Sequence, residues 1–576
     1  MKMRNYRFIF SLLLMLFAST EWSAQNFAWA KRGGLWAYDY GYGITTDNFG
    51  NVYVSGKYEM NANFNGVVLP CQGNHDIFLA SYSPSGSLNW IRTAGGYTGD
   101  YATCVATDKT SSVYIAGEIE GVNAKIVFPG SATTLQCISS NDIFLAKYSL
   151  SGNLIWARSA GGYDYEKALG ITYDGIGNVY ICGLFRGSAK FGGVSTIYSS
   201  GDNDIFIAKY DNDGNFKWVR KAGSAGRDEA KSITCDASGN IYITGLYKNG
   251  CQFGNQTLYA PNGFFNLFLA RYDTNGNLIW VKSGGGNYDD VGWGVTAASN
   301  GKIYVAGEFN ATATFSGQSI WTSGSADVLV ACYDASGSIQ WLKRAGGSAA
   351  DRARGIGSIG SRILLTGQFG NTASFGGITK TASDASDIFM AGMDLAGNFL
   401  WAASAGGGAD AFEDLGYESG NAICGETNGN VYSTGSMLNG AQFGATYLSS
   451  WSRTDMFIAK LQTPALLMEQ GDDMSTQKIF DSSSLTISEK YVAQFPVSAE
   501  PFLYPNPARD YFAVKFPVDT LIDSEIMVFN QLGERVFNFT GNISELNVDI
   551  SQLENGIYIV WVKTGEAVIR RRLIIQ

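Results

Sequence analysis

The stretch Asp204-Ile-Phe-Ile-Ala-Lys-Tyr210-Asp-Asn-Asp-Gly214-Asn-Phe-Lys-Trp218-Val-Arg220 decides the fold of this chain. Apolar and polar residues alternate on both sides of the Asp-Asn-Asp-Gly-Asn segment, and a glycine in such a turn adopts positive φ without strain. The pattern therefore predicts two antiparallel strands joined by a tight turn. Close relatives of this hairpin recur along most of the sequence, which indicates a repeat architecture.

Three markers agree on the number of repeats. Each repeat carries one tryptophan in its last strand: Trp29, Trp90, Trp156, Trp218, Trp280, Trp341 and Trp401. Seven copies are also found of a Gly-Asn-Val-Tyr-Val-x-Gly strand and of the Asp-Ile-Phe-Leu-Ala-Lys-Tyr pattern. With an inner strand such as Gly43-Ile-Thr-Thr-Asp47, each repeat has four strands, which predicts an all-β, seven-bladed β-propeller. A Phe-Gly segment, such as Phe191-Gly192-Gly193, is interpreted as an outer-rim loop.

The two ends of the repeat region are out of phase. The chain enters at Trp29, in a fourth strand, and leaves after residues 455–461, which form a third strand. The last blade therefore lacks its outermost strand. We expect residues 27–33 to pair beside residues 455–461 and to close the ring, because this removes two exposed sheet edges.

Composition and the N-terminus limit the class of protein. Lys2, Arg4 and Arg7 precede a short apolar run that ends at Ala18, which predicts a signal peptide over residues 1–24 and leaves no transmembrane segment in the mature chain. A formal charge of −10 argues against nucleic acid as a partner. With His75 as the only histidine, zinc sites of the His/Cys type and histidine-dependent triads are excluded. The cysteines occupy positions that other residues hold in the other repeats, which argues against a disulfide framework. Cys71 and Cys137 are the one pair considered for a disulfide, and Cys332 is expected to be exposed.

The character of the sequence changes after residue 463. Residues 464–500 are rich in Ser, Asp, Glu and Gln without periodicity, which predicts a linker between the propeller of residues 25–463 and a module of residues 501–576. That module has short alternating strands separated by turn residues, as in a small β-sandwich. Its motif residues are Tyr504, Pro505, Asn506, Pro507, Gly533, Asp549, Leu553, Gly556 and Tyr558.

Two resemblances follow from these motifs. The Gly-Asn-x-Tyr-x-x-Gly and Asp-x-Phe-x-Ala-Lys-Tyr patterns resemble the SBBP propeller repeats of secreted bacterial proteins, which implies a fold and an extracytoplasmic location. The C-terminal motifs resemble the sorting domain of the type IX secretion system of Gram-negative bacteria. That resemblance implies recognition by the type IX machinery, removal of the domain near its start, and a product that is secreted or on the outer cell surface.

The link between the tryptophan strand and the next inner strand carries the candidate ligand-binding residues. An acid recurs there in every repeat: Asp39, Asp100, Glu166, Asp228, Asp290, Asp351 and, less regularly, Asp414. Aromatic residues accompany several of the acids: Trp36, Tyr97, Tyr163 and Tyr288. Two explanations of the acids stay open. In the first, which is favoured, each carboxylate accepts hydrogen bonds from backbone N–H groups of its own link. In the second, the ring of acids binds a calcium ion, which is the one cofactor considered.

The favoured interpretation is a binding module whose ligand is an extracellular glycan or protein. One alternative is a glycan-cleaving hydrolase that uses paired carboxylates, and the near-sevenfold repetition of the acids weakens it because catalysis needs a distinctive local site. A passive surface scaffold is the other alternative. No residue is assigned a catalytic role.

Overall fold

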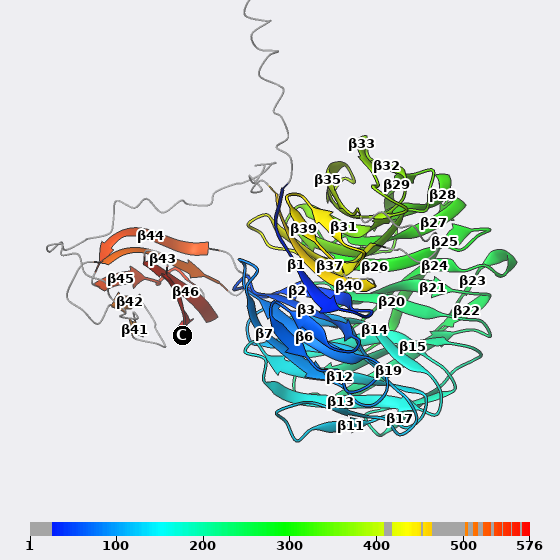
Figure 1. Cartoon of the computed structure of the whole chain (residues 1–576), viewed down its shortest axis with the longest axis horizontal. Coiled ribbons are helices and arrows are strands. Elements are labelled where there is room, and N and C mark those ends of the chain that lie inside the picture. The colour runs from blue at the N-terminus through cyan, green and yellow to red at the C-terminus, as the bar shows by residue number, and fades with distance from the viewer. Residues whose placement is uncertain are drawn as a thin grey trace, which may run out of the picture. The chain divides into compact units, whose positions relative to one another are not determined.

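The computed structural model describes residues 26–407, 418–450, 453–463, 502–504, 511–515, 522–530, 535–543, 545–553, 556–564 and 567–575. These residues form antiparallel β-sheets together with one short 3₁₀ turn at Pro261–Gly263. Within these ranges no helix has the length and hydropathy to cross a membrane. The chain divides into two units, Met1–Met468 and Glu469–Gln576 (Figure 1). The expected signal peptide and linker lie outside the described residues.

Unit one is built from groups of antiparallel strands in which first, second, third and fourth strands pair in that order. The first strands are β2 (Tyr40–Thr46), β8 (Asp100–Thr107), β14 (Glu166–Tyr173), β20 (Glu229–Cys235), β26 (Val291–Ala297), β30 (Arg352–Ile359) and β36 (Ser419–Gly425). The second strands are β3 (Val52–Tyr58), β9 (Ser112–Glu120), β15 (Asn178–Phe185), β21 (Ile241–Tyr247), β27 (Ile303–Phe315), β31 (Arg362–Phe369) and β37 (Asn430–Leu438).

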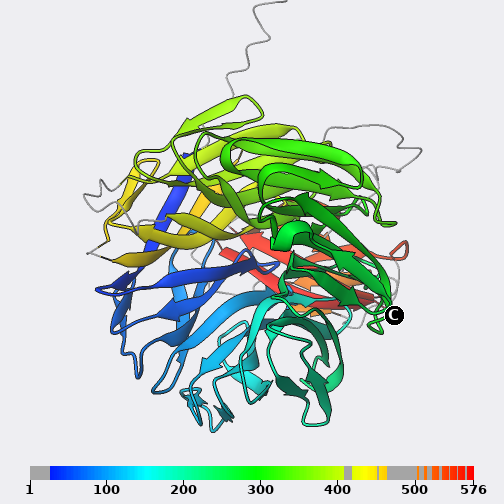
Figure 2. The ribbon, with the colours of Figure 1, turned by 90° about the vertical axis from the view of Figure 1, so that its right-hand side faces the viewer.

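The third strands are β6 (Asp76–Tyr82), β12 (Asn141–Ser149), β18 (Asp204–Asp211), β24 (Asn266–Tyr272), β28 (Gln318–Tyr333), β34 (Asp387–Asp394) and β40 (Thr454–Gln462). The fourth strands that follow them are β7 (Leu88–Ala94), β13 (Leu154–Gly162), β19 (Phe216–Gly223), β25 (Leu278–Gly286), β29 (Ile339–Gly347) and β35 (Phe399–Ala405). Each first strand contacts the first strand of the next group, and β36 contacts β2. The groups accordingly follow one another around a common centre (Figure 2).

The first strand of the chain supplies the fourth position of the last group. β1 (Asn26–Leu35) pairs with β40 from Asn26 opposite Gln462 to Gly33 opposite Met456. Its C-terminal end then pairs with β4 (Ala62–Phe64) of the first group. The pairing of residues 27–33 beside residues 455–461, expected from the phase of the repeats, is confirmed.

The segment interpreted as an outer-rim loop is a short β-hairpin. The hairpins are β4 with β5 (Val67–Leu69), β10 (Lys125–Val127) with β11 (Thr134–Gln136), β16 (Ser188–Phe191) with β17 (Ser195–Tyr198), β22 (Gly250–Phe253) with β23 (Gln256–Tyr259), β32 (Thr372–Phe375) with β33 (Ile378–Thr381), and β38 (Ala441–Phe443) with β39 (Thr446–Leu448). In the fifth group the hairpin continues β27 into β28. The first hairpin strand pairs with the fourth strand of the preceding group, as β16 does with β13. The hairpin, which accounts for the extra length of the repeat, thus connects neighbouring groups through strand pairing.

The core lies between neighbouring groups. Second strands such as β3 and β21 are buried along their whole length, because both faces of the strand pack against adjacent sheets. One hydrophobic cluster combines Tyr114 of the second group with Phe206 of the third. Burial of apolar surface therefore stabilises the interfaces between groups as well as each sheet.

The repeated tryptophan locks each group to the turn of the next. The indole of Trp218 donates a hydrogen bond to Thr274 O at 3.2 Å, and Arg220 Nε donates to Gly276 O at 2.9 Å. The guanidinium of Arg220 lies 5.1 Å from the indole centroid. Gly276 has φ of +77°, and a Cβ there would lie 3.1 Å from the indole, so glycine suits both the turn and the contact. The tryptophan and the base two residues later therefore connect neighbouring groups.

Replacing Trp218 with Phe tests this lock. We expect the variant to lose about 1 kcal/mol of unfolding free energy, because Thr274 O loses one donor while most of the aromatic packing remains. Urea unfolding would measure the loss. Trp321→Phe is the matched control, since Trp321 is 67% exposed. Equal stability losses in the two variants would contradict the lock.

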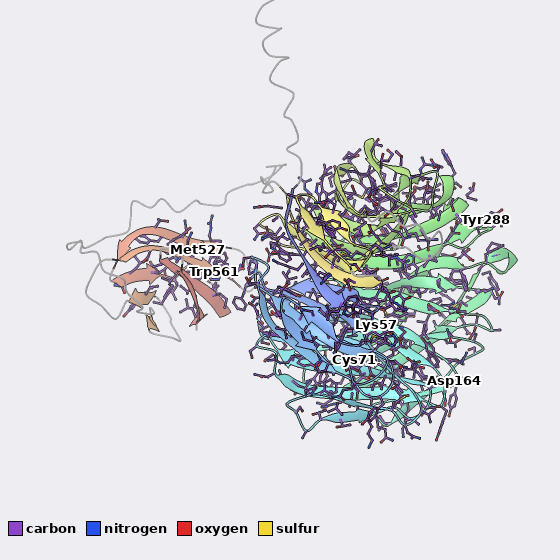
Figure 3. All side chains as sticks on the ribbon, viewed as in Figure 1. Lys57, Cys71, Asp164, Tyr288, Met527 and Trp561 are labelled. Atoms are coloured by element: carbon purple, nitrogen blue, oxygen red, sulfur yellow. The ribbon has the colours of Figure 1, made fainter. Side chains whose placement is uncertain are left out.

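Unit two contains two described sheets with a shared core. One sheet has the order β41 (Phe502–Tyr504), β42 (Tyr511–Lys515), β45 (Glu545–Asp549). The other has the order β44 (Arg535–Ile543), β43 (Ile522–Phe529), β46 (Gly556–Thr564), β47 (Ala567–Ile575). Val514 of the first sheet and Val560 of the second belong to one hydrophobic cluster. Trp561 packs on Phe529 with the ring centroids 4.9 Å apart; Figure 3 labels Trp561 and Met527.

The motif residues of the expected sorting domain fall partly within this unit. Tyr558 is buried in its core, and Leu553 packs against that core. Asp549 accepts a hydrogen bond from Ser551 N at 2.9 Å, and Gly556 begins β46. Tyr504 ends β41, whereas Pro505, Asn506, Pro507 and Gly533 lie outside the described residues.

The eight cysteines are all free thiols. Cys71 and Cys137, the pair considered for a disulfide, are therefore not bonded to each other. The expected exposure of Cys332 is wrong: its side chain is fully buried in the cluster that contains Phe389. Cys332 fills a small apolar position at an interface between groups.

Candidate functional site

Six of the predicted link acids are described, and all six are buried. Asp39, Asp100, Glu166, Asp228, Asp290 and Asp351 are each at most 1% exposed. Each stands at or just before the start of a first strand. Asp414 lies outside the described residues, and Glu418, which immediately precedes β36 and is 2% exposed, stands in the equivalent place.

Backbone N–H groups of the link and of the second strand surround these carboxylates. Asp351 accepts hydrogen bonds from Gly347 N at 2.7 Å and from Gly370 N at 3.1 Å, so it ties the link to the end of β31. The link donor recurs as Gly96 for Asp100 and Gly162 for Glu166, each at 2.9 Å. The expected hydrogen bonds from the acid's own link are thus confirmed at these positions. The acids do not form the open ligand-facing surface that the sequence suggested, because the backbone encloses them.

A second buried side chain faces each link acid. It is the residue of the third strand that begins the Asp-Ile-Phe pattern, for example Asp142 opposite Glu166. A Cβ on Gly161 would lie 2.3 Å from Asp142 Oδ1 and 2.9 Å from Glu166 Oε2, so both carboxyl groups converge on this glycine. The same convergence occurs at Gly346 between Asp327 and Asp351. In the fourth group the third-strand member is Asn266, which faces Asp290 at the start of the fifth group across Gly285.

Burial shifts these carboxyl groups toward their protonated forms. Desolvation, with a further contribution from the charge of the facing acid, raises the pKa of Asp39, Asp100 and Glu166 to about 8. The pKa of Asp290 and of Asp351 rises to about 7 for the same primary cause. Cations approach some of the third-strand acids from the fourth strand, as Arg344 does at 3.5 Å from Asp327. Burial therefore favours the protonated form of these carboxyl groups.

The predicted link aromatics lie at the surface, unlike the acids. Trp36 is 58% exposed, Tyr97 91%, Tyr163 81% and Tyr288 51%. Tyr288, which Figure 3 labels, packs against Phe264 with the ring centroids 5.6 Å apart. We call these four residues the link aromatics. Large planar side chains with a polar tip suit contact with a ligand in water.

A second exposed aromatic set lies on the hairpins. Its members occupy the second strand of a hairpin in four different groups: Tyr198, Tyr259, Trp321 and Tyr447. Each is more than half exposed. We call these the hairpin aromatics. Sequence reasoning missed them because the segment was interpreted as an irregular loop rather than as a strand with alternating faces.

Side chains near the start of the first strands lie close to side chains near the end of the second strands, such as Lys57, Glu118 and Glu308. We call this set the inner ring: Tyr40, Lys57, Tyr101, Glu118, Lys167, Glu229, Lys231, Trp293, Glu308, Arg352, Arg354 and Ser419. Lys167 Nζ lies 2.5 Å from Glu118 Oε1 of the preceding group and 5.1 Å from the ring centroid of Tyr101. Glu229 forms ion pairs with Lys231 and Arg227, and Arg352 forms one with Glu308. The indole of Trp293 donates to Glu308 at 3.1 Å.

The composition of the inner ring differs from group to group. The residue directly after the link acid is Tyr40, Tyr101, Lys167, Glu229, Val291, Arg352 or Ser419. Surrounding positions repeat, so this variation marks a place where the groups are not interchangeable. The repeat pattern does not indicate this position, because the residues there differ between repeats. The signal in the sequence is a position that directly follows a repeated acid and that differs in charge and aromaticity from repeat to repeat.

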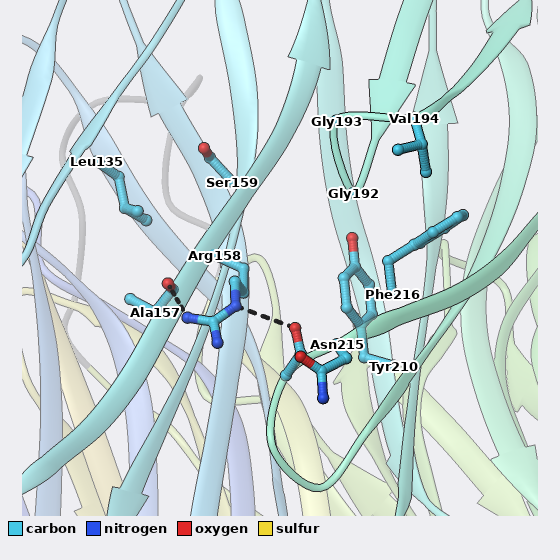
Figure 4. Close-up of a pocket in the computed structure, with 11 residues that line it drawn as sticks. Leu135, Ala157, Arg158, Ser159, Gly192, Gly193, Val194, Tyr210, Asn215 and Phe216 are labelled. Atoms are coloured by element: carbon cyan, nitrogen blue, oxygen red, sulfur yellow. Dashed lines mark hydrogen bonds between the residues drawn. The ribbon is translucent and has the colours of Figure 1, made fainter.

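A surface groove of about 470 Å³ lies between the second and third groups (Figure 4). Its lining includes Arg158, Gly192, Val194 and Phe216. Arg158 donates to Gly214 O at 3.0 Å and to Ala157 O at 2.9 Å, as part of the repeated Trp-and-base lock. The guanidinium group of Arg158 is thus engaged in holding neighbouring groups together.

The described residues contain no group of three or more His, Cys, Asp and Glu side chains arranged to hold a metal ion. The carboxyl pairs provide two acids each. The calcium ion considered for the acid ring stays a prediction.

Comparison with protein families matches three stretches of the chain. Residues 502–576 match the secretion system C-terminal sorting domain. Residues 21–57 match the β-propeller repeat SBBP, and residues 298–339 match a β-propeller domain of unknown function, DUF5122. The sorting-domain match indicates export by type IX secretion to the cell surface or the extracellular space.

Two curated proteins match shorter parts of the chain. The uncharacterized WD repeat-containing protein L264 of Acanthamoeba polyphaga mimivirus is 24% identical over 241 residues, which are 34% of this chain and 17% of that protein. The regulatory protein FlaEY of Caulobacter vibrioides is 26% identical over 175 residues, which are 30% of this chain and 18% of that protein. The matched stretches span less than a fifth of either relative.

Two solved structures align with the chain at low sequence identity. A quinohemoprotein alcohol dehydrogenase from Comamonas testosteroni aligns with a TM-score of 0.34 and 12% identity, over 81% of this chain and 79% of that one. PorZ, a surface component of the type IX secretion system of Porphyromonas gingivalis, aligns with a TM-score of 0.27 and 10% identity, over 92% of this chain and 74% of that one. The chain thus joins β-propeller repeats to a secretion-system C-terminal sorting domain, which confirms both resemblances found in its sequence.

Proposed function

We propose that this chain is a secreted or cell-surface binding module, a seven-bladed β-propeller exported through the type IX secretion system. The first strands β2, β8, β14, β20, β26, β30 and β36 are the innermost strands of the seven four-stranded blades, and β1 completes the last blade. The two sheets of unit two form the C-terminal sandwich. Residues 25–463 are the propeller, residues 464–500 the linker and residues 501–576 the sorting domain.

The inner ring is the observation that carries the binding role. Repeated residues in this chain serve the fold: the tryptophans lock blades, and the link acids hold backbone N–H groups. The inner ring instead varies from blade to blade, and the exposed link aromatics accompany the same links. Distinct polar side chains beside exposed aromatic rings suit recognition of one asymmetric ligand, a glycan or a protein.

The burial of the link acids weighs against a hydrolase. Paired carboxyl groups must reach a glycosidic bond to act on it, whereas the six described link acids are at most 1% exposed. A scaffold that binds no ligand would not explain why the residues of the inner ring differ from blade to blade. Binding is therefore the function we favour.

Arrays of extracellular glycans and surface proteins, probed with the full chain, test the proposal. We expect selective binding to a narrow ligand set, with no release of reducing sugar from bound glycans. Release of reducing sugar would favour the hydrolase. An absence of binding on both arrays would favour the scaffold.

Export should shorten the protein at its C-terminus. The sorting domain resembles a removable signal, so the exported form is expected to end between residues 464 and 504. Intact mass spectrometry of protein from the medium and from the cell surface would locate the end. Detection of Gln576 in the exported form would contradict this expectation.

A further inference from the structure

The junction between the second and third blades holds two buried carboxyl groups that each have an unpartnered oxygen. Asp142 is 1% exposed and Glu166 is 0% exposed. One oxygen of each group accepts a backbone hydrogen bond of 2.9 Å, from Ile138 N for Asp142 and from Gly162 N for Glu166. The other two, Asp142 Oδ1 and Glu166 Oε1, have no hydrogen-bond partner among the described residues. Buried polar atoms are normally satisfied by a partner, so these two oxygens point to a ligand.

The two carboxyl groups face each other closely enough to share one ion. A Cβ on Gly161 would lie 2.3 Å from Asp142 Oδ1 and 2.9 Å from Glu166 Oε2, so these oxygens are no further apart than the two distances together. Calcium binds carboxylate oxygens at about 2.3–2.6 Å. A single calcium ion can therefore bridge the pair.

Other junctions carry a positive charge that this one lacks. In three blades a base of the fourth strand approaches the third-strand acid: Lys221 lies 3.8 Å from Asp204, Arg344 3.5 Å from Asp327, and Arg32 3.5 Å from Asp455. In the second blade Ser159 occupies this position of the fourth strand, opposite Phe144. Among the described residues, Asp142 and Glu166 have no ion pair within 4.0 Å. The chain thus supplies its own cation to three junctions and none to the pair of Asp142 and Glu166.

The groups around the pair keep its charge dependent on pH. Desolvation raises the pKa of Glu166 to about 8 and that of Asp142 to about 6, and the charge of Asp142 adds to the shift of Glu166. Asp164 raises the pKa of Glu166 further, while Arg186 opposes this and is itself paired with Asp164 at 2.7 Å. Burial raises the pKa of the Cys137 thiol to about 12, so this neighbour stays neutral. Both carboxyl groups are therefore ionised only at alkaline pH, unless a cation binds them.

From these contacts we infer that Asp142 and Glu166 hold a calcium ion between the second and third blades. The ion displaces the protons that the pair binds at lower pH, so its uptake releases protons. The two carboxylates supply up to four ligand oxygens, and carbonyl groups or water supply the others. The site lies within one junction and pairs a link acid with a third-strand acid, so it is distinct from a ring of link acids around the channel. It goes beyond the proposed function, because it connects two blades and does not contact the ligand.

Equilibrium dialysis of the full chain against radioactive calcium at about pH 8 tests the inference. Asp142→Asn should bind one ion fewer per chain than the parent, because it removes a charged ligand. Ser159→Lys should also lose one ion, because it places at this junction the base that Lys221 supplies in the next blade. Ser283→Lys is the matched control: it adds a base at the same position of the fourth blade, whose junction pairs Asn266 with a single acid. This control should bind as many ions as the parent.

The outcomes separate a specific site from general charge effects. Equal numbers of bound ions in the parent and Asp142→Asn, including none in either, would overturn the inference and leave only a proton between the carboxyl groups. Equal losses in Ser159→Lys and Ser283→Lys would overturn it as well, since added charge would then explain both. Melting curves in chelator check that the variants fold, and calcium should raise the melting temperature of the parent more than that of Asp142→Asn. The same rise in both would contradict the site.

Discussion

A chain that begins after residue 33 is expected to lose the cooperative unfolding of unit one. The deletion removes seven residue pairs between β1 and β40, and one of the three pairs of β1 with β4, that of Gly33 with Phe64. Phe27 packs edge-on against Phe443 at 5.3 Å, and Ala30 is buried at the same interface. Asp455 also loses its ion-pair partner Arg32, which lies 3.5 Å away in the intact chain.

The expected loss is large compared with the stability of an ordinary domain. Each ladder hydrogen bond contributes about 1 kcal/mol net, and buried apolar groups add to this, against a total of about 5–15 kcal/mol. The open edge of β40 would also pair with other chains, so aggregation is expected.

Calorimetry of the shortened chain should show a broad or absent transition. A peptide of residues 26–35, added in excess, should restore part of the transition by pairing with β40. A scrambled peptide of the same composition is the control. An unchanged transition in the shortened chain would contradict the closing role of β1.

Stability is also expected to fall as the pH rises from about 4 to about 8. The link acids have a pKa near 3.8 or 4.5 when unfolded, and burial raises the pKa of Asp39, Asp100 and Glu166 to about 8 in the folded chain. A raised folded pKa means that the folded state holds protons that the unfolded state has released. The stabilisation from these protons is complete below the unfolded pKa and is lost as the pH passes the folded pKa. Each such group lowers the unfolding free energy by about 1.4 kcal/mol per pH unit within the window.

Melting temperatures at intervals from pH 5 to pH 8.5 would measure this decline. Asp142→Asn gives the pair of residues 142 and 166 the Asn and acid combination that Asn266 and Asp290 already form, so this variant should fold and show a flatter pH profile. Asp202→Asn is the control, because Asp202 is half exposed. A melting temperature that rises toward pH 8 in the parent chain would contradict the assignment of the carboxyl pairs.

Much of unit one could be predicted because its repeats encode the same contacts many times. The tryptophan, the turn glycine and the base two residues later identify the lock between blades, and the phase of the two ends predicts the pairing of β1. The hairpins were missed because strands as short as Ser188–Phe191 have too few residues for alternation to be recognised. Their pairing with the preceding fourth strand is also a contact between distant parts of the sequence.

The site could be predicted only in part, for a different physical reason. The positions of the link acids and of the link aromatics follow from the repeat, but their exposure depends on which backbone groups the fold brings to them. Asp351, for example, is enclosed by N–H groups of Gly347 and Gly370, which are separated by a whole hairpin of strands. The inner ring arises from side chains of neighbouring blades, so Lys57 and Tyr101 meet only in three dimensions.

The central claim is that the link side of the propeller, with its inner ring, is the binding surface. The most direct measurement compares ligand binding by two variants of the full chain, using the ligand identified on the arrays. One variant replaces the link aromatics Trp36, Tyr97, Tyr163 and Tyr288 with Ala, and the other replaces the hairpin aromatics Tyr198, Tyr259, Trp321 and Tyr447 with Ala. Both remove four exposed aromatic side chains. We predict a loss of affinity of at least about tenfold in the link variant, from lost aromatic contacts, and near-parent affinity in the hairpin variant. Parent affinity in the link variant together with lost binding in the hairpin variant would contradict the claim.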